Sequence, residues 1–491
     1  MRRILLLIFA LSAILALSAQ SNLNINGLNE AQFIYRDAAD SLNIYFKDSF
    51  AMNLAYKDFG FGMKFIAELP KYGMDQADMI DDLRPINIKM AWEELYLSYE
   101  KGPWMTRAGT IYETFGSGLV FRSYEDKEFD MDHRLSGFHF RYDDDFRIKA
   151  VYGAIQNVKN PSILELGYGL DLEFPIRFFT VGASMAGFRN TTALNIYDQT
   201  EIFSGRFGMN YGPLSAKAEY ATRDLYKVAQ PESGSAIYTN ANLSFGPVLL
   251  GAAYKNYDQF QFRQQDVPLA NYHGETLADN QASALDEIGL QGWSNLAIND
   301  SWSLDLNYAE AWNQDESKRM NDAYAALEYS GDALSGGLSW SHVEKTGSDL
   351  NGLGQSVSYW QREITPAFHA NFPAWGKALG LTGEFKLVDK ESLDATAGDY
   401  ALKGHYEPKL QADIALGKVS LSLGAQSEWE DFSAIMESRY WANAEARISL
   451  FDHSDILVFA GREAGGKVCR NGMCRYVAPF SGLRVELATR F

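Results

Sequence analysis

The chain has 491 residues, of which 46% are hydrophobic and 14% aromatic, and its formal net charge is −19 at pH 7. This acidic balance argues against nucleic acid as a partner, because nucleic-acid binders present a basic face to the phosphates. The mean hydropathy is −0.24, and no apolar run after residue 19 is long enough for a spanning helix. The composition therefore excludes a helical membrane protein, while it suits a sheet in which only every second residue meets lipid.

Residues 1–19 have the features of a secretory signal peptide. Met1-Arg2-Arg3 is basic, Ile4 to Leu17 is apolar, and Ala16-Leu17-Ser18-Ala19 supplies small residues for cleavage. The apolar stretch is short for a spanning helix, which disfavours the alternative of an uncleaved anchor. No Cys follows it, so we expect no lipoprotein anchor. We expect export of the chain and a single folded domain over residues 20–491.

The exported part alternates between tight turns and long polar segments. The predicted tight turns all contain Gly, Pro, Asn or Asp: Glu100–Pro103, Asp143–Asp145, Phe174-Pro175, Tyr211–Pro213, Gly246-Pro247, Asn299-Asp300, Gly331-Asp332, Gly417-Lys418 and Asp452–Ser454. The predicted long loops are Lys71–Lys89, Arg189–Thr200, Arg223–Ser235, Asp258–Asp286, Glu344–Arg362, Glu428–Arg439 and Arg462–Pro479. Short turns on one side and long loops on the other are typical of transmembrane β-barrels.

The predicted strands have one apolar and one polar face. Phe138, Phe140 and Tyr142 alternate with His139 and Arg141, and the same period of two recurs at residues 216–220, 302–308 and 419–426. The polar faces would line a lumen with charges of both signs: Arg141, Lys149, Lys217, Glu219, Asp305, Glu384, Lys386, Glu445, Arg447, Arg484, Glu486 and Arg490. A wettable lumen that passes hydrophilic solutes is one interpretation. The other is that these charges pair across strands and fill the interior.

These patterns predict an all-β fold, a single large transmembrane antiparallel β-barrel of about 22 to 24 strands with short periplasmic turns and long extracellular loops. A soluble sandwich would bury its apolar face. A β-solenoid would need a fixed short repeat, and the sequence contains none.

One segment departs from the alternation. Residues 107–128 run from a strand through Gly116-Ser117-Gly118 and a short apolar piece into a dense cluster of charges. The two glycines allow a chain that folds back into a barrel and narrows it, and charged side chains there would set a field across the opening. The candidate constriction or pore-lining residues are Glu113, Arg122, Glu125, Asp126, Asp132 and Arg134. The alternative is an ordinary solvated outer loop.

Two cysteines occur near the end of the chain, in Cys469-Arg470-Asn471-Gly472-Met473-Cys474. Asn-Gly favours a hairpin turn, which would bring the two thiols together. An exported chain meets an oxidising compartment, so we predict a disulfide that closes this loop. A metal site would need further ligands, which the neighbouring sequence lacks.

The last strand, Gly482–Phe491, places Leu483, Val485, Leu487 and Phe491 on one face and the charged residues on the other. With its terminal aromatic, this strand resembles the carboxy-terminal signature of Gram-negative outer-membrane β-barrels, which their assembly machinery recognises. The resemblance makes Gly482, Leu483, Val485, Leu487 and Phe491 a candidate assembly signal. It implies contact with outer-membrane lipid and lipopolysaccharide, and with the barrel assembly machinery.

Residues 107–128 and the cysteine loop Gly465–Pro479 resemble an uncharacterised family of long outer-membrane barrels. In that family a Gly-aromatic-Tyr-acid-x-Phe-Gly-x-Gly run leads to Arg-x-Tyr-Glu-Asp, and a Cys-x4-Cys loop precedes the final strand. Thr110-Ile111 departs mildly from the first run. The resemblance covers the chain from about residue 22 to its end and implies fold and location without an activity.

Three hypotheses for function follow. The first is a channel or transport component of the outer membrane, because so many strands enclose a wide lumen. Predicted strands begin almost at the cleavage site, so we expect no separate amino-terminal plug domain of the kind that TonB-dependent transporters have. The second is a structural or adhesive surface protein whose acidic loops bind Ca²⁺, with Asp75, Asp78, Asp81 and Asp82 or residues 125–132 as oxygen donors.

The third hypothesis, an outer-membrane enzyme, lacks a motif. The seven His residues form no pair with one another or with a nucleophile, and neither Gly-x-Ser-x-Gly nor His-Glu-x-x-His occurs. We therefore expect no catalytic residues, no cofactor and no dedicated metal site.

Overall fold

The computed structural model describes residues 23–37, 43–69, 89–126, 131–156, 164–191, 197–226, 232–262, 267–268, 277, 285–350, 356–393, 400–430, 439–470, 473–477 and 479–491. The predicted signal peptide lies outside these residues, as do Asp75, Asp78, Asp81 and Asp82. No helix within the described ranges has the length and hydrophobicity to traverse a bilayer.

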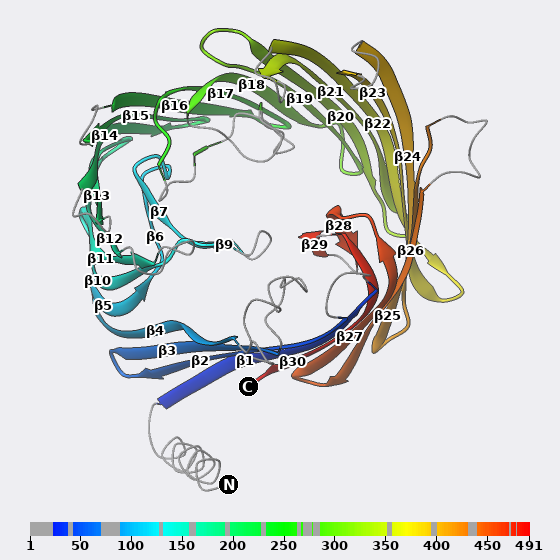
Figure 1. Ribbon diagram of the computed structural model, residues 1–491, viewed down its shortest axis with the longest axis horizontal. Helices are drawn as coiled ribbons and strands as arrows, with labels where there is room; N and C mark the ends of the chain where they lie inside the picture. The colour runs from blue at the N-terminus through cyan, green and yellow to red at the C-terminus, as the bar shows by residue number, and fades with distance from the viewer. Residues whose placement is uncertain are drawn as a thin grey trace, which may run out of the picture.

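Twenty-four antiparallel strands form one closed sheet, which confirms the predicted barrel (Figure 1). The wall strands are β1 Leu23–Arg36, β2 Ile44–Tyr56, β3 Phe59–Leu69, β4 Lys89–Lys101, β5 Trp104–Ile111, β10 Leu135–Asp143, β11 Arg147–Gln156, β12 Leu164–Ile176, β13 Phe179–Thr191, β14 Tyr197–Tyr211, β15 Leu214–Tyr226, β16 Glu232–Phe245, β17 Val248–Asp258, β18 Asp286–Ala297, β19 Trp302–Trp312, β20 Lys318–Ser330, β21 Ser335–Leu350, β22 Ser356–Ala374, β23 Lys377–Leu393, β24 Tyr400–Ala415, β25 Val419–Glu428, β26 Arg439–Phe451, β27 Ser454–Glu463 and β30 Phe480–Arg490.

Six shorter strands do not belong to the wall. β6 Glu113–Phe115 pairs with β7 Phe121–Ser123, β8 Glu125–Asp126 pairs with β9 Met131–Asp132, and β28 Gly466–Arg470 pairs with β29 Met473–Val477. Figure 1 shows that β6, β7 and β9 lie inside the ring near β10–β14, while β28 and β29 lie inside it near β25–β27.

The last strand closes the barrel against the first. The β1–β30 register runs from Leu28 opposite Arg490 to Arg36 opposite Gly482. Phe491 extends this seam by exchanging backbone hydrogen bonds of 2.8 and 3.1 Å with Gly27. Its ring stacks on Phe50 of β2 at 5.8 Å and fills the space that a side chain at residue 27 would need. The terminal aromatic is thus part of the outer surface across the seam.

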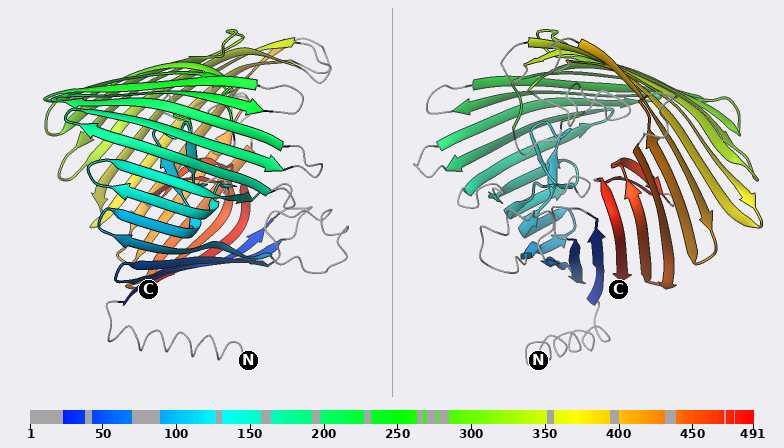
Figure 2. Two further views of the ribbon diagram at one scale, coloured as in Figure 1. Left: turned by 90° about the vertical axis from the view of Figure 1, so that its left-hand side faces the viewer. Right: turned by 45° about the vertical axis from the view of Figure 1, so that its right-hand side comes forward.

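The connections alternate as the sequence predicts. Tight turns gather at one end of the wall, where β1 also begins and β30 ends, and the strands run obliquely to the axis (Figure 2). We call this the turn end and the opposite end the loop end. Three predicted loops are too long, because most of their residues continue a ladder of paired strands. Glu344–Arg362 continues the β21–β22 ladder up to Leu350 opposite Ser356, and Arg189–Thr200 and Arg223–Ser235 likewise extend the β13–β14 and β15–β16 ladders. Both faces of these strand ends carry mostly polar side chains. The alternation of apolar and polar residues that predicts a strand is therefore missing there.

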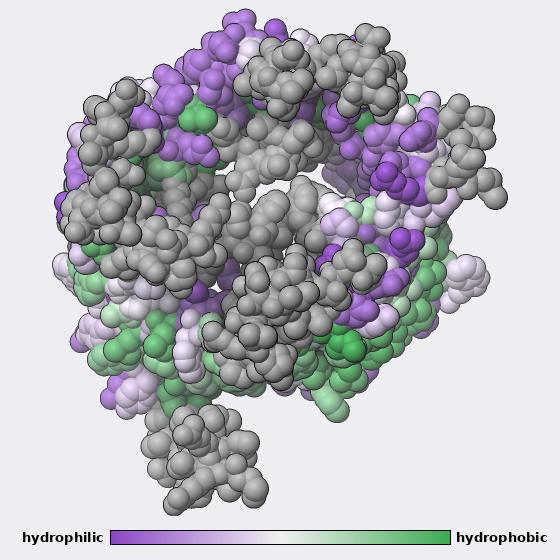
Figure 3. Space-filling view, in the orientation of Figure 1, coloured by the Kyte–Doolittle hydropathy of each residue, from purple (hydrophilic) through white to green (hydrophobic). Residues whose placement is uncertain are grey.

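The two faces of the wall follow the period of two. Phe138, Tyr220 and Tyr308 are about half exposed on the outside, while their neighbours His139, Glu219 and Asn307 are buried on the inside. Apolar residues cover the outer wall at the lower right of Figure 3, and hydrophilic residues cover much of the rim that faces the viewer.

Candidate functional site

Residues 112–126 and 131–134, which we call the inner segment, lie in the chain between the wall strands β5 and β10. Ile111 at the end of β5 lies opposite Leu135 at the start of β10, so the two wall strands pair directly and the segment between them is an excursion. Within it, β6 and β7 form a small hairpin from Glu113 opposite Ser123 to Phe115 opposite Phe121. The excursion extends into the lumen (Figure 1).

A hydrophobic core holds the inner segment to the wall. Phe115, Leu119, Val120 and Phe121 are completely buried. They cluster with wall residues near the loop end, namely Ile111, Leu135, Val151, Ile155, Ala186, Ile202, Ala221, Ala236 and Tyr257, and with Phe260 and Val267 of the connection between β17 and β18. Burial of each large side chain stabilises the docked position by about 2–3 kcal/mol.

The inner wall beneath this core is apolar, which corrects the expectation of a uniformly polar lumen. Ile155, Ile202 and Ala221 occupy positions that face inward and are almost fully buried. Gly169 of β12 leaves room for the ring of Phe115, whose Cε2 would lie only 2.6 Å from a Cβ at residue 169. The wall therefore carries a receptor surface shaped for the segment.

The Gly116-Ser117-Gly118 turn docks on a buried carboxylate of the wall. Glu219 Oε2 accepts a hydrogen bond of 2.8 Å from the backbone N–H of Ser117, and Glu219 Oε1 accepts one of 2.9 Å from Ser204 Oγ. Gly116 has a φ of +53°, and a Cβ there would lie 2.6 Å from Glu219 Oε2. Only glycine meets both the dihedral and the close approach.

Glu113 forms the first charged anchor of the segment. Its Oε1 lies 2.9 Å from Lys149 Nζ on β11, and its Oε2 lies 3.1 Å from His139 Nε2 on β10. Lys149 also donates a 2.8 Å hydrogen bond to Thr114 O. Burial alone would raise the pKa of Glu113, but the contacts with His139 and Lys149 outweigh it and hold that pKa at about 2.

Ser123 ties the two ends of the excursion together. Its Oγ lies 2.8 Å from Ile111 O and 2.9 Å from His133 O, and it accepts a 3.0 Å hydrogen bond from Leu135 N. Because these three backbone groups flank the segment, one buried hydroxyl holds its entry and exit side by side.

A second charged anchor joins the far end of the segment to β3 and β4. Glu125 Oε1 lies 2.6 Å from Lys64 Nζ, which is also 3.2 Å from Glu93 Oε2. Arg134 donates a hydrogen bond to the backbone carbonyl of Glu93. The segment thus contacts wall strands on both sides of its origin.

The predicted constriction residues all belong to the inner segment. They do not face one another across the lumen from opposite walls. Glu113, Glu125 and Arg134 contact the wall, and the Arg122 guanidinium lies 4.6 Å from the ring centre of Tyr124. The backbones of Asp126 and Asp132 belong to β8 and β9, but their side chains lie outside the described part.

The sequence alone did not identify the wall residues Lys64, Glu93 and His139 as members of the site. The apolar receptor surface was not predicted either, although the sequence contains a signal for it. Val151, Ile155, Ile202 and Ala221 stand at inward positions of strands whose other inward residues are mostly polar. Such apolar interruptions of a polar inner face indicate a surface that protein covers.

Several predicted lumen charges form ion pairs: Lys386 and Arg490 pair with residues of neighbouring strands, and Arg484 pairs with Glu486 on its own strand. Lys386 lies 2.6 Å from Glu363, Arg484 lies 2.7 Å from Glu486, and Arg490 lies 3.1 Å from Asp455. On β12–β14, Arg206 contacts Asp171 at 2.7 Å and donates a 2.6 Å hydrogen bond to Ser184 Oγ. These pairs stiffen the wall and leave its inner face polar towards the turn end.

The other predicted features lie partly beyond the described residues. Cys469 lies opposite Cys474 in the β28–β29 register, but their side chains are not described, so the disulfide stays a prediction. Among the described residues, no three His, Cys, Asp or Glu side chains are placed to hold a metal ion.

Comparison with known proteins supports the fold. A family model described as "Family of unknown function (DUF6029)" matches residues 1–285. The siderophore receptor PirA from Pseudomonas aeruginosa superposes with a TM-score of 0.50 at 10% identity, over 96% of this chain and 81% of the receptor. No curated protein matches the sequence.

An E. coli P pilus tip assembly intermediate, PapC-PapD-PapK-PapG, superposes with a TM-score of 0.52 at 10% identity, over 95% of this chain. This chain spans 60% of the matched chain of that assembly. Both structures show that the fold is that of an outer-membrane β-barrel, and at 10% identity they show no more than the fold.

Proposed function

This chain belongs to the family of unknown function DUF6029, and on that premise we propose that it is an outer-membrane transport barrel for hydrophilic solutes. We propose further that the inner segment narrows the lumen of this barrel. The turn end is then periplasmic and the loop end extracellular. A wall of 24 strands encloses a wide lumen. The inner segment takes up part of that lumen at its extracellular half.

The observation that carries the proposal is the docked position of the inner segment. A solvated outer loop would need no buried core. Four apolar side chains of the inner segment are nevertheless completely buried against the inner wall. Two charged anchors, on Lys149 and on Lys64, hold it at separate places. A fixed obstruction of this kind sets the free cross-section of a pore.

The polar inner face towards the periplasmic end supports passage of hydrophilic solutes. Near that end Arg147 pairs with Glu173 and Arg490 pairs with Asp455, and all four side chains stay partly exposed to solvent. Partly exposed charged groups of this kind favour a water-filled lumen. The proposal assigns no catalytic step to the protein, since the polar groups of the inner segment serve to hold it in place.

Removal of the inner segment tests the proposal. Because Ile111 lies opposite Leu135, a short Gly-Ser linker can replace residues 113–134 without disturbing the wall. We expect the single-channel conductance in planar bilayers to rise several-fold over that of the wild type. Heat-modifiable electrophoretic migration would establish that both barrels are folded.

A matched control shortens the β21–β22 hairpin, which belongs to the wall at the same end of the barrel. This variant should conduct as the wild type does. Equal conductance of the wild type and the variant without residues 113–134, or no conductance from either folded barrel, would contradict the proposal.

A further inference from the structure

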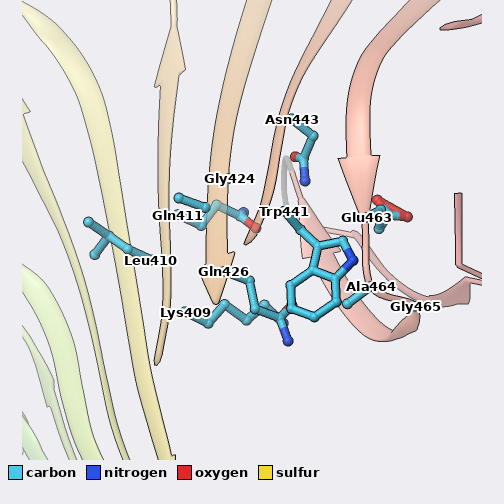
Figure 4. Close-up of a pocket in the computed structure, with 11 residues that line it drawn as sticks. Lys409, Leu410, Gln411, Gly424, Gln426, Trp441, Asn443, Glu463, Ala464 and Gly465 are labelled. Atoms are coloured by element: carbon cyan, nitrogen blue, oxygen red, sulfur yellow. The ribbon is translucent and has the colours of Figure 1, made fainter. Parts of the chain in front are cut away.

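A hollow opens on the wall across the ring from the inner segment, over β24–β27. Six polar or aromatic side chains surround it, namely Lys409, Gln411, Gln426, Trp441, Asn443 and Glu463 (Figure 4). Their neighbours Leu410 and Leu423 are more than half exposed on the outer face. The period of two therefore places the hollow on the lumen side.

The strand register arranges these side chains in two rows. Lys409 lies opposite Gln426, which lies opposite Trp441, so a cation, an amide and an indole stand side by side on β24, β25 and β26. At about 4.8 Å between strands, this row spans about 10 Å. In the next row Gln411 lies opposite Gly424, and Gly424 lies opposite Asn443.

Glycines allow close approaches at the hollow and beside it. Gly424 lies beneath the Asn443 amide, whose Oδ1 would be 2.7 Å from a Cβ at residue 424. Gly461, opposite Asn443 in the register, has a φ of +130°, and a Cβ would lie 2.3 Å from Ala442 O. Gly424 therefore contributes only backbone to the lining of the hollow, while the six residues named above contribute side chains.

Several groups on the rim remain available to a ligand. Within the described ranges, Trp441 stacks on no other ring and makes no hydrogen bond, and the Gln426 amide makes none either. Asn443 Nδ2 donates to Arg462 O at 3.2 Å, but Asn443 Oδ1 is buried and accepts no hydrogen bond from a described residue. A buried acceptor of this kind is stabilised when a donor reaches it.

We propose that this hollow is a subsite for a neutral saccharide unit, an inference that rests on the proposed transport function and names its substrate class. The apolar face of a pyranose ring fits against the indole of Trp441. The hydroxyl groups of the sugar can both donate and accept hydrogen bonds, and so can the amides of Gln426 and Asn443. Lys409 and Glu463 both line the hollow and carry opposite charges, which favours a ligand without net charge.

The same sugar chemistry has two sources, a soluble oligosaccharide in transit or the sugar of a lipopolysaccharide. Both can be tested by calorimetric titration of the folded barrel in a detergent without sugar headgroups. The probes are maltohexaose, cellohexaose and chitohexaose for the first source and purified lipopolysaccharide for the second.

We expect at least one probe to bind the wild type, and we expect Trp441→Ala to weaken that binding at least tenfold. Gly424→Val, which fills the floor of the hollow and removes no ring, should weaken it similarly. The matched control is Tyr440→Ala, because Tyr440 is the adjacent aromatic on the outer face, and it should leave binding unchanged. Trp441-dependent binding of an oligosaccharide assigns the soluble source, and Trp441-dependent binding of lipopolysaccharide alone assigns the second source.

The inference is overturned if no probe binds, or if binding survives both Trp441→Ala and Gly424→Val. The conductance experiment above separates its failure from that of the proposed function. A barrel that conducts ions and binds no sugar keeps the transport function and loses the subsite. A barrel that binds sugar through Trp441 without conducting keeps the subsite and loses the channel.

Discussion

Two sectors of the same wall differ in what their inner faces carry. On β10–β17, inward positions near the loop end hold apolar residues such as Ile155 and Ile202, and the inner segment covers them. On β24–β27, inward positions hold Lys409, Gln426 and Trp441 around a hollow. Apolar surface left in water costs about 25 cal/mol per Å², so apolar inward residues indicate a covered wall and polar ones a wet wall.

The largest effect is expected from the core of the covered sector. Phe115→Ala leaves a cavity against Gly169 and should destabilise the docked position by about 3–5 kcal/mol. Trypsin cleavage after Arg122 in the folded barrel should become many times faster, as peptide mass spectrometry would show.

The control for this change is Phe207→Ala. Phe207 is an exposed ring on the outer face, where it packs on Phe179 at 5.4 Å. Its removal should leave Arg122 protected. Equal cleavage rates in the wild type and Phe115→Ala would mean that the core does not hold the segment.

Acid should release the charged anchor at Glu113. The pKa of Glu113 is about 2 in the docked segment, against an ordinary value of 4.5. Because the docked pKa is the lower one, this stabilisation is complete above about pH 4.5 and is lost as the pH falls towards 2, on the order of 3 kcal/mol in total. Conductance should therefore rise between pH 5 and pH 2.5.

Glu113→Gln provides the comparison, because it removes the titrating group. This variant should conduct more than the wild type at pH 5 and change little on acidification. An unchanged pH profile in Glu113→Gln would assign the response to another group.

The anchor between Lys64 and Glu125 should contribute less, because both side chains are partly accessible to water. A double-mutant cycle of Lys64→Met and Glu125→Gln, with cleavage after Arg122 as the readout, should give a coupling energy of about 0.5–3 kcal/mol. Strict additivity of the two changes would show that the ion pair does not hold the segment.

The smallest effect is expected at the hairpin beside the polar sector. Cys469 and Cys474 are opposite each other in β28 and β29, and opposed Cα atoms in an antiparallel pair are within disulfide range. We expect alkylation of the unfolded chain only after reduction. Replacement of both by Ser should barely change the melting of the barrel, because the closed loop is short. Labelling without reductant would refute the disulfide.

Much of the fold could be predicted from the sequence, because the bilayer imposes a strong local pattern. Alternation in residues 138–142 and 302–308 indicated which face meets lipid, and Gly and Pro turns indicated where strands end. The outer part of the β21–β22 hairpin could not be predicted. There both strand faces carry polar residues, so the alternation of apolar and polar side chains is absent. Of the site, Gly116-Ser117-Gly118 marked the inner segment, while its receptor residues are spread over strands far apart in sequence.

By itself the sequence determined a barrel, its alternating turn and loop ends and the amphipathic closing strand, because each depends on neighbours a few residues apart. Only the tertiary structure decided that the inner segment lies inside the ring and that it contacts Lys64, Lys149 and Glu219 of the wall. It also decided that Lys409, Gln426 and Trp441 form one row. Those relations depend on register and closure, which bring together residues that no local pattern connects.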